Sequence, residues 1–283
     1  MLNMYTTIIS AEELQNHISE SDWVVFDCRF NLADTLAGKN AYLDGHIPGA
    51  IYLDLDQDLS SPITLETGRH PLPDLERFVD RLAQAGVNNN TQVIVYDDCA
   101  GAMAARCWWL LRLVGHKAVA VLDGGLAAWQ SLGGQLNNHI PQPASTAYTF
   151  SLLPNQNLTV AEVEEALDAQ SIYLVDARAA ERYRGEVEPI DPIAGHVPSA
   201  LNRPLTDNLA EGKFKPAVQL RKEWLQLLGD KSIEAVVHMC GSGVTACHNQ
   251  LAMEIAGLSG SRVYSGSWSE WIRDPARPIA TKS

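Results

Sequence analysis

Short apolar runs alternate with longer amphipathic stretches along this chain, and the alternation predicts its secondary structure. The segments "QVIVYD" and "EAVVHM" are continuous runs rich in valine and isoleucine, typical of strands buried on both faces. After each run, apolar residues recur at the i, i+3, i+4 spacing of one helix face. These residues are Met103, Cys107, Leu110, Leu111 and Val114 in the first stretch, and Val244, Cys247, His248, Leu251, Ala252 and Ile255 in the second. Strand followed by helix, repeated, predicts an α/β fold with mainly parallel sheets that carry helices on both faces.

The same pattern occurs twice. The recurring pairs are "WVVFDCRF" (23–30) with "IYLVDARA" (172–179), "DGHIPGAIY" (44–52) with "AGHVPSALN" (194–202), and residues 93–129 with residues 235–271. In the last pair, Gly101 and Trp129 match Gly243 and Trp271, each 142 positions later. Duplication of one domain is the simplest explanation. We therefore predict one domain at 1–140, a linker rich in Asn, Pro and Ser at 141–157, and a second domain at 158–283.

Residues that recur in both copies are expected to be structural. Arg29 and Arg178 each follow a strand aspartate by two positions, and His46 and His196 each precede a proline in the same motif. Neither pair distinguishes the copies, so neither explains a function confined to one of them.

Composition excludes several classes of function. The chain has 283 residues and a net charge of −13, which argues against nucleic acid or an anionic membrane as a partner, since both favour a basic face. The first residues show no secretory signal, and no apolar run is long enough to span a membrane. The five cysteines include no C-x-x-C pair, which fits a reducing cytoplasm better than a disulfide framework or a zinc site. We expect a cytoplasmic protein.

The segment "HMCGSGVTAC" (238–247) carries the candidate chemistry. It joins a strand to a helix, where open α/β sheets bind ligands and where unpaired amides and the helix dipole favour an anion. Two glycines allow successive N–H groups to turn inward, and two hydroxyl side chains add donors. The loop is expected to hold a negatively charged sulfur of Cys240. The loop residues are Gly241, Ser242, Gly243, Val244 and Thr245.

The two copies differ at this loop. An offset of 142 places Cys240 on Asp98, which predicts one active and one inactive copy. Cys99 is adjacent, and a one-residue slip would pair the two cysteines, but the matched glycines and tryptophans disfavour that slip.

Four motifs together resemble the tandem-domain rhodanese-type sulfurtransferases over nearly the full chain. They are "CGSGVT", "GHIPGA", "DARAAERYRG" and "LDGGLAAW". The resemblance implies two rhodanese-like domains and a Cys240 thiolate that takes sulfur from a donor as a persulfide. A thiol, thioredoxin or cyanide then accepts the sulfur. It implies no metal and no organic cofactor, and we expect a monomer.

Two donors fit this family, 3-mercaptopyruvate and thiosulfate. Arg182 stands where the family places a substrate-binding arginine, although a structural ion pair is the alternative. Gly241 and Ser242 are neutral where the thiosulfate branch carries a basic pair, which favours mercaptopyruvate. The mercaptopyruvate branch has a second arginine where this chain has Ile190, and Arg203 is a candidate replacement.

The mercaptopyruvate branch also implies a serine–histidine–aspartate relay assembled across the two domains. Ser242 matches its serine, and His70 and Asp56 are the candidate partners from the first copy. The alternative for His70 is an exposed loop histidine. In a relay, these groups would protonate the leaving enolate.

Two other classes of protein share features of this segment. A protein phosphatase needs Cys-x5-Arg, and Ala246 stands at the arginine position. A non-catalytic rhodanese binding module is expected to lack the loop cysteine. Cys240 is present, so that hypothesis holds only if the thiol is buried or inert.

Overall fold

The computed structural model describes residues 4–282, which form two compact units. Unit 1 contains the described residues up to Ser61, Leu72–Leu153 and Glu211–Phe214; unit 2 contains Pro62–Pro71, Pro154–Ala210 and the described residues from Lys215 onward. The expected linker is thus divided, because residues 141–153 belong to unit 1 and residues 154–157 to unit 2. The segment Pro62–Pro71 comes from the first copy of the repeat but packs with unit 2.

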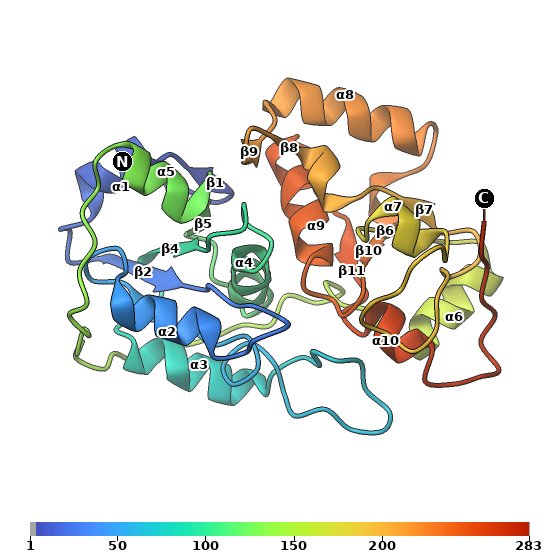
Figure 1. Ribbon diagram of the computed structural model, residues 1–283, viewed down its shortest axis with the longest axis horizontal. Helices are drawn as coiled ribbons and strands as arrows, with labels where there is room; N and C mark the ends of the chain where they lie inside the picture. The colour runs from blue at the N-terminus through green and yellow to red at the C-terminus, as the bar shows by residue number, and fades with distance from the viewer. Residues whose placement is uncertain (1–3, 283) are drawn as a thin grey trace. The chain divides into compact units, whose positions relative to one another are not determined.

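Unit 1 is built on a five-stranded parallel sheet of order β1-β5-β4-β2-β3 (Figure 1). Its strands are β1 (Ile8–Ile9), β2 (Trp23–Asp27), β3 (Ile51–Tyr52), β4 (Gln92–Tyr96) and β5 (Val119–Leu122). Its helices are α1 (Ala11–His17), α2 (Ala37–Asp44), α3 (Leu75–Gln84), α4 (Ala104–Leu113) and α5 (Gly125–Ser131). The short strand β9 (Lys213–Phe214) also belongs to this unit.

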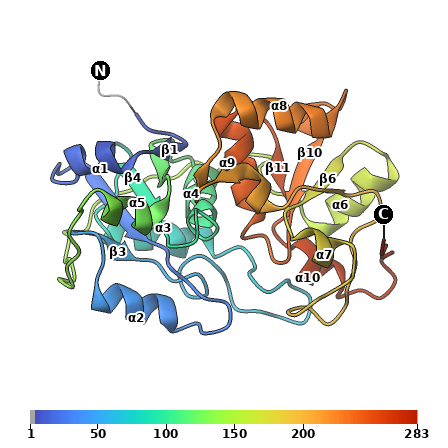
Figure 2. The ribbon, with the colours of Figure 1, turned by 45° about the horizontal axis from the view of Figure 1, so that its top comes forward.

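Both faces of this sheet are covered. Ile94 of β4 lies in one apolar cluster with Leu14 of α1 and Trp129 of α5, and these two helices lie side by side in both views (Figures 1 and 2). Val93 and Val95 point to the opposite face and are equally buried, beneath α4. Strands buried on both faces need apolar side chains at every position, which explains the continuous run in the sequence.

Unit 2 repeats this plan with a four-stranded parallel sheet of order β11-β10-β6-β7. The four strands of this sheet are β6 (Tyr173–Asp176), β7 (Leu201–Asn202), β10 (Val236–Met239) and β11 (Arg262–Val263). Unit 2 also contains the short strand β8 (Leu209–Ala210), which lies outside this sheet. Its helices are α6 (Val160–Asp168), α7 (Ala180–Tyr183), α8 (Ala217–Leu228), α9 (Ala246–Ile255) and α10 (Ser267–Trp271), with 3-10 turns η1 (Leu205–Asn208) and η2 (Ile233–Ala235). Helices α6 and α10 cover one face of the sheet, and α8 and α9 cover the other (Figure 2).

Side-chain caps start several of the helices. Ser10 accepts a hydrogen bond from the third residue of α1, and Asp74 does the same for α3. Thr159 and Glu162 form a reciprocal capping box at the start of α6. Each cap satisfies an amide that has no partner inside its helix, so these polar residues fix where the helices begin.

The recurring polar residues have the same structural part in each unit, as expected. The guanidinium of Arg29 donates to Asp27 and to the Gly45 carbonyl (2.8 Å), and that of Arg178 donates to Asp176 and to the carbonyl of Gly195 (2.7 Å). His46 likewise stacks on Tyr42, and His196 stacks on Tyr183. These contacts stabilise the fold in both units.

Within residues 4–282, no helix combines the length and the apolar character that crossing a membrane requires.

Candidate active site

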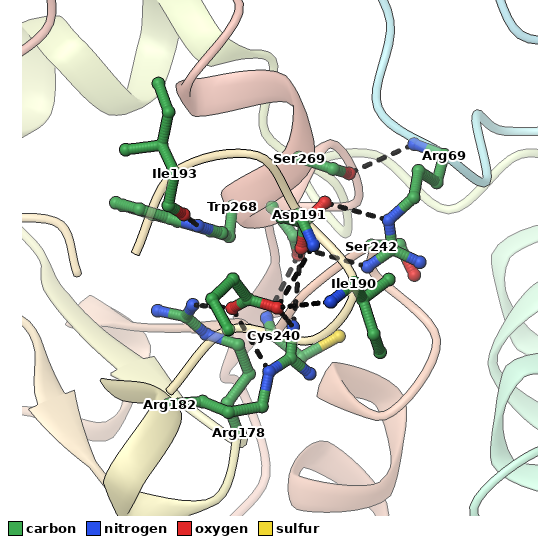
Figure 3. A network of polar contacts seen from close by, with 12 residues as sticks. Arg69, Arg178, Arg182, Ile190, Asp191, Ile193, Cys240, Ser242, Trp268 and Ser269 are labelled. Atoms are coloured by element: carbon green, nitrogen blue, oxygen red, sulfur yellow. Dashed lines mark hydrogen bonds and ion pairs between the residues drawn. The ribbon is translucent and has the colours of Figure 1, made fainter. Parts of the chain in front are cut away.

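Cys240 stands directly after β10, an interior strand of the unit 2 sheet, where the loop 240–245 leads into α9. The last residue of β10, Met239, pairs with Asp176 at the end of β6, so two neighbouring parallel strands end beside the cysteine. Open α/β sheets bind ligands outside the carboxyl ends of their strands. The thiol therefore lies at the edge of the sheet where this fold class places its sites (Figure 3).

Gly243 shapes the loop around the sulfur. Its φ is +79°, and a Cβ at this position would lie 2.0 Å from the Ser265 carbonyl oxygen, so no larger residue fits. Its backbone N–H donates to Cys240 Sγ over 3.1 Å. The glycine thus aims an amide at the sulfur, which is where a negative charge on that atom would be stabilised.

The beginning of α10 holds the loop in place. Ser267 Oγ accepts a hydrogen bond from the Cys240 amide (3.0 Å), and the Cys240 carbonyl accepts one from the amide of Trp268 (3.0 Å). The Gly241 carbonyl accepts a third from the amide of Ser269 (2.9 Å). Because both ends of the cysteine backbone are tied to one helix, the sulfur has a fixed position.

The other loop residues complete this turn. Val244 is buried and Thr245 immediately precedes α9. Ser242 is buried, and its Oγ lies 2.7 Å from Nδ1 of His70. His70 is also buried rather than exposed, and it belongs to the segment Pro62–Pro71 that packs with unit 2. The structure therefore brings together the serine and the histidine that the sequence singled out.

Two arginines lie over Gly241, the residue next to the cysteine. A Cβ at Gly241 would lie 2.9 Å from Arg69 Nη2 and 3.6 Å and 3.7 Å from the two terminal nitrogens of Arg182. Arg182 was expected here from the sequence, whereas Arg69 was not. The only available signal was its position beside His70 in "GRHPLP", which gave no indication of its role.

Two carboxylates hold these arginines. Asp191 accepts from Arg69 Nε (2.9 Å) and Arg69 Nη2 (3.2 Å), and it lies 3.4 Å from Arg182 Nη2. Glu188 accepts from Arg182 Nη2 over 2.6 Å. Burial raises the pKa of Glu188, but hydrogen bonds from Arg182 and from backbone amides outweigh it and hold that pKa below its usual value. Glu188 is therefore ionised at neutral pH, and its charge is paired.

Two expected site residues have other surroundings. The Arg203 guanidinium donates to Asn208 (2.8 Å) and Glu223 (2.9 Å) and lies over the ring of Trp224, which favours a structural role. Asp56 belongs to unit 1, where its amide donates to Asp54 (2.9 Å). Burial, followed by the charge of Asp54, raises the pKa of the Asp56 carboxyl. The part of Asp56 in a relay stays a prediction.

Comparisons with known proteins identify the fold. The family model of the rhodanese-like domain matches residues 10–132 and again residues 159–274. The chain belongs to the rhodanese family. A Pseudomonas aeruginosa protein named "Probable 3-mercaptopyruvate sulfurtransferase" is 46% identical over 97% of this chain and 98% of its own. A Mycobacterium tuberculosis relative with the name of a thiosulfate sulfurtransferase, SseB, is 38% identical over 96% of each chain.

A solved structure agrees with both. The crystal structure of SseA from Escherichia coli, described as a 3-mercaptopyruvate sulfotransferase, superposes with a TM-score of 0.80 and 31% identity, covering 94% of this chain and 100% of that one. The two rhodanese domains and their mainly parallel sheets are therefore as the sequence predicted.

The first rhodanese domain has an aspartate in place of the cysteine, but it is Asp97 and not Asp98. In unit 1 Tyr96 pairs with Asp27, as Met239 pairs with Asp176 in unit 2. The next carbonyl, of Asp97, accepts from the amide of Leu126, as the Cys240 carbonyl accepts from Trp268. The prediction of Asp98 was wrong because the first loop is one residue longer, so the 142-residue offset holds for the helices but not for the strand end.

The side chain of Asp97 fills its own loop. Oδ1 accepts from the amides of Cys99 (3.0 Å) and Gly101 (2.9 Å), and Oδ2 accepts from those of Met103 and Ala104 (both 2.8 Å). Asp97 is fully buried, whereas Asp98 is exposed. The amides that begin α4 are thus occupied by a carboxylate of the chain itself.

Among the described residues, no group of three or more His, Cys, Asp or Glu side chains is arranged to hold a metal ion. The five cysteines all lie within the described range, and none of them forms a disulfide.

Proposed function

We propose that this rhodanese is a sulfurtransferase that moves sulfur from 3-mercaptopyruvate to a thiophilic acceptor through a persulfide on Cys240. The observation that carries the proposal is the position of Cys240 Sγ, 3.1 Å from an inward-facing amide and next to a residue that two guanidinium groups approach. The names of the relatives support the reaction class.

The first half-reaction breaks the C–S bond of the donor and forms an S–S bond. The Cys240 thiolate attacks the donor sulfur, and the electron pair of the broken bond leaves on carbon as the enolate of pyruvate. The proton that the donor thiol carried is lost from sulfur, and one proton is gained by the departing carbon. The products are a Cys240 persulfide anion and pyruvate, so no oxidant or reductant is needed.

Ser242 and His70 are assigned to the proton transfer. Their 2.7 Å contact lets the histidine orient the serine hydroxyl, which follows Cys240 by two residues in the loop. Asp56 is proposed as the third member, on the resemblance to the mercaptopyruvate branch alone.

The loop amides are assigned to the persulfide. In the first rhodanese domain a carboxylate occupies the amides of Gly101, Met103 and Ala104, which correspond to Gly243, Thr245 and Ala246. An anion attached to the position of Cys240 therefore fits this set of donors.

The second half-reaction passes the sulfur to an acceptor, for which we propose a small thiol, thioredoxin or cyanide. The described cysteines form no disulfide, which suits a reducing compartment, and we propose that the protein is a cytoplasmic monomer.

Two alternatives have their own support. Thiosulfate is the donor in the name of one relative at 38% identity, and two guanidinium groups also suit its doubly charged anion. A non-catalytic binding module remains the rival from another class, since Cys240 is only 2% exposed.

One measurement distinguishes a mercaptopyruvate sulfurtransferase, a thiosulfate sulfurtransferase and a non-catalytic binding module. Purified protein is incubated with 3-mercaptopyruvate or with thiosulfate, and its intact mass is recorded, followed by peptide mapping. One added sulfur on Cys240, formed faster with mercaptopyruvate, is the expected result. Faster sulfuration by thiosulfate would change the donor. No added sulfur with either donor would overturn catalysis in favour of the binding module.

A further inference from the structure

The segment Pro62–Pro71 is exposed over its first half and buried over its second. Residues 62–66 are exposed, whereas Gly68 and His70 are buried and the residues beside them are half-buried. The second half therefore makes the contacts that place the segment within unit 2, and it ends at the histidine that lies against Ser242.

Two side chains, one from α10 and one from the turn after it, hold the backbone of this second half. Ser269 Oγ accepts a hydrogen bond from the Arg69 amide over 3.0 Å (Figure 3). Arg273 Nε donates to the Thr67 carbonyl, also over 3.0 Å. Because one contact lies on each side of Gly68, the two together fix the backbone there. Arg273 is exposed, so water competes for its hydrogen bond, and the contact of Ser269 is the stronger of the two.

The Ser269 hydroxyl is oriented for this contact. It donates to the Gly266 carbonyl, 3.4 Å away, which leaves the oxygen lone pairs to accept from the Arg69 amide. Ser269 is only 3% exposed, so little water is present to replace the hydrogen bond when the hydroxyl is removed.

Gly68 allows the segment to approach α10 this closely. A Cβ at position 68 would lie 2.5 Å from the Gly266 carbonyl oxygen and 2.8 Å from Ser269 Oγ. Both distances are shorter than a van der Waals contact, so a larger residue would push the segment away from the helix.

The first copy shows that the shared fold does not require this serine. Ser269 corresponds to Ala127 at the offset of 142, and Ala127 is an exposed residue of α5. The equivalent helix thus forms without a hydroxyl at this position. The hydroxyl of Ser269 is therefore a feature of the copy that contains Cys240, which favours a role in the site.

We propose that Ser269 is a positioning residue for proton transfer: by holding the Arg69 amide, it places the next residue, His70, at the hydroxyl of Ser242. Nδ1 of His70 lies 2.7 Å from Ser242 Oγ, and this contact depends on the backbone that Ser269 holds. The inference rests on the proposed function, in which His70 orients the serine that acts on the leaving enolate.

The test compares a donor that needs proton transfer with one that does not. Rapid-quench measurement follows sulfuration of Cys240 in the wild type and in Ser269→Ala, with 3-mercaptopyruvate and with thiosulfate. We expect Ser269→Ala to lower the mercaptopyruvate rate about 10-fold, because His70 loses its fixed position. The thiosulfate rate should change by less than about twofold, because release of sulfite needs no proton on carbon. The Arg69 side chain keeps its ion pair with Asp191 in this variant, so the charges beside Cys240 are unchanged.

Ser261→Ala is the matched control. Ser261 is another buried serine of unit 2, 2% exposed, and its Oγ lies 3.1 Å from Nε2 of His238. Its hydroxyl forms no hydrogen bond to a described residue of the segment Pro62–Pro71. The same chemical change at this position should alter neither rate.

A double-mutant cycle separates positioning from general damage to the fold. In a Ser242→Ala background the serine hydroxyl is already lost, so adding Ser269→Ala should lower the mercaptopyruvate rate by less than about a further twofold. Gly68→Ala displaces the same backbone by a different route and should follow the same pattern, with a loss of about 30-fold with mercaptopyruvate. If Gly68→Ala fails to fold, Ser269→Ala decides by itself.

Equal losses with both donors in Ser269→Ala, or losses that multiply in the double variant, would show that Ser269 only stabilises unit 2 and would overturn the inference. Unchanged rates in Ser269→Ala would overturn it as well. If the wild type reacts with mercaptopyruvate alone, the double-mutant cycle decides. A wild-type protein that takes no sulfur from mercaptopyruvate would instead refute the proposed function itself.

Discussion

The loop after β4 and the loop after β10 occupy the same place in two copies of one fold. They differ in the group that accepts hydrogen bonds from their backbone amides. Both present backbone amides at the start of a helix, where negative charge is favoured. In the first loop the carboxylate of Asp97 accepts four of these hydrogen bonds. In the second, the side chain at that position is a thiol that accepts one, from Gly243. The first copy contains its anion permanently, whereas in the proposed function the second acquires its anion only as a reaction intermediate.

The two loops therefore have separate roles, one structural and one proposed to be catalytic. In the first loop, four backbone amides already donate to the carboxylate of Asp97, which favours a structural role for that loop. In the proposed function, the amides of the second loop bind the persulfide, which forms and is consumed in each turnover.

Replacing Cys240 by serine should have the largest effect. We expect Cys240→Ser to lower sulfur transfer by more than about 1,000-fold, because the oxygen cannot form the persulfide. Cys99→Ser, in the equivalent loop of unit 1, should leave the rate unchanged. Steady-state transfer from 3-mercaptopyruvate to a thiol measures both variants. A comparable loss in Cys99→Ser would contradict the assignment of activity to one copy.

Removing the internal anion should destabilise unit 1. Asp97→Ala leaves four amides, two in buried and two in part-buried hydrogen bonds, without their acceptor, so the free energy of unfolding should fall by about 3–5 kcal/mol. Asp98→Ala is the control, and since Asp98 is exposed it should change that free energy by less than about 1 kcal/mol. Urea denaturation curves compare the two. Equal effects would argue against the position given to Asp97.

Removing the Ser242 hydroxyl should affect one donor and spare the other. We expect Ser242→Ala to lower kcat with 3-mercaptopyruvate about 100-fold, because the leaving enolate must be protonated. Thiosulfate releases sulfite, which needs no proton on carbon, so its rate should change little. Rapid-quench measurement of persulfide formation with each donor checks this. Equal losses with both donors would remove Ser242 from proton transfer.

Acid should destabilise the second copy through a residue that the first lacks. Burial lowers the pKa of His238 to about 3, from 6.5. Between pH 6.5 and pH 3, His238 therefore binds a proton in the unfolded chain but stays neutral in the folded chain. The stability of the fold is unaffected by His238 above pH 6.5, and it decreases as the pH falls from 6.5 toward 3. At pH 5 the loss is about 2 kcal/mol relative to pH 7.

Val95 occupies the equivalent position in unit 1, so His238→Val supplies the comparison. The variant should show a smaller loss of unfolding free energy between pH 7 and pH 5, by the same about 2 kcal/mol. Urea denaturation at the two pH values measures it. A wild-type loss that the variant fully retains would assign the acid sensitivity to other groups.

A cysteine placed in the first loop should not take up a second sulfur atom. Asp97→Cys restores the thiol, but six residues after the strand aspartate Asp27 stands Ala33, where the second copy has Arg182 after Asp176. We therefore expect one sulfur per chain after treatment with 3-mercaptopyruvate, as in the wild type. Intact mass detects the difference. A second sulfur, mapped to position 97, would show that the donor arginines are dispensable.

The sequence predicts what depends on local pattern. The parallel strands follow from continuous apolar runs, and the anion loop follows from a glycine-rich segment between a strand and a helix. Arg182 and the contact of Ser242 with His70 were also anticipated, through the family resemblance.

What the sequence does not reveal are contacts between distant segments and small changes in loop length. Arg69 and Asp191 form one ion pair although 122 residues separate them, and no periodicity marks such a pair. Asp97 was missed because one extra residue in a loop leaves the matched glycines and tryptophans in register. Only the backbone hydrogen bonds around the strand end locate that extra residue.

The segment Pro62–Pro71 has a consequence for modularity. It is encoded within the first repeat, yet it places Arg69 and His70 against the cysteine loop of the second. A gene fragment that begins at the linker would keep the nucleophile and lose both of these side chains. The two repeats are therefore not interchangeable, because the first contributes this segment to the unit that contains Cys240. Recombination between the repeats would separate residues that lie together.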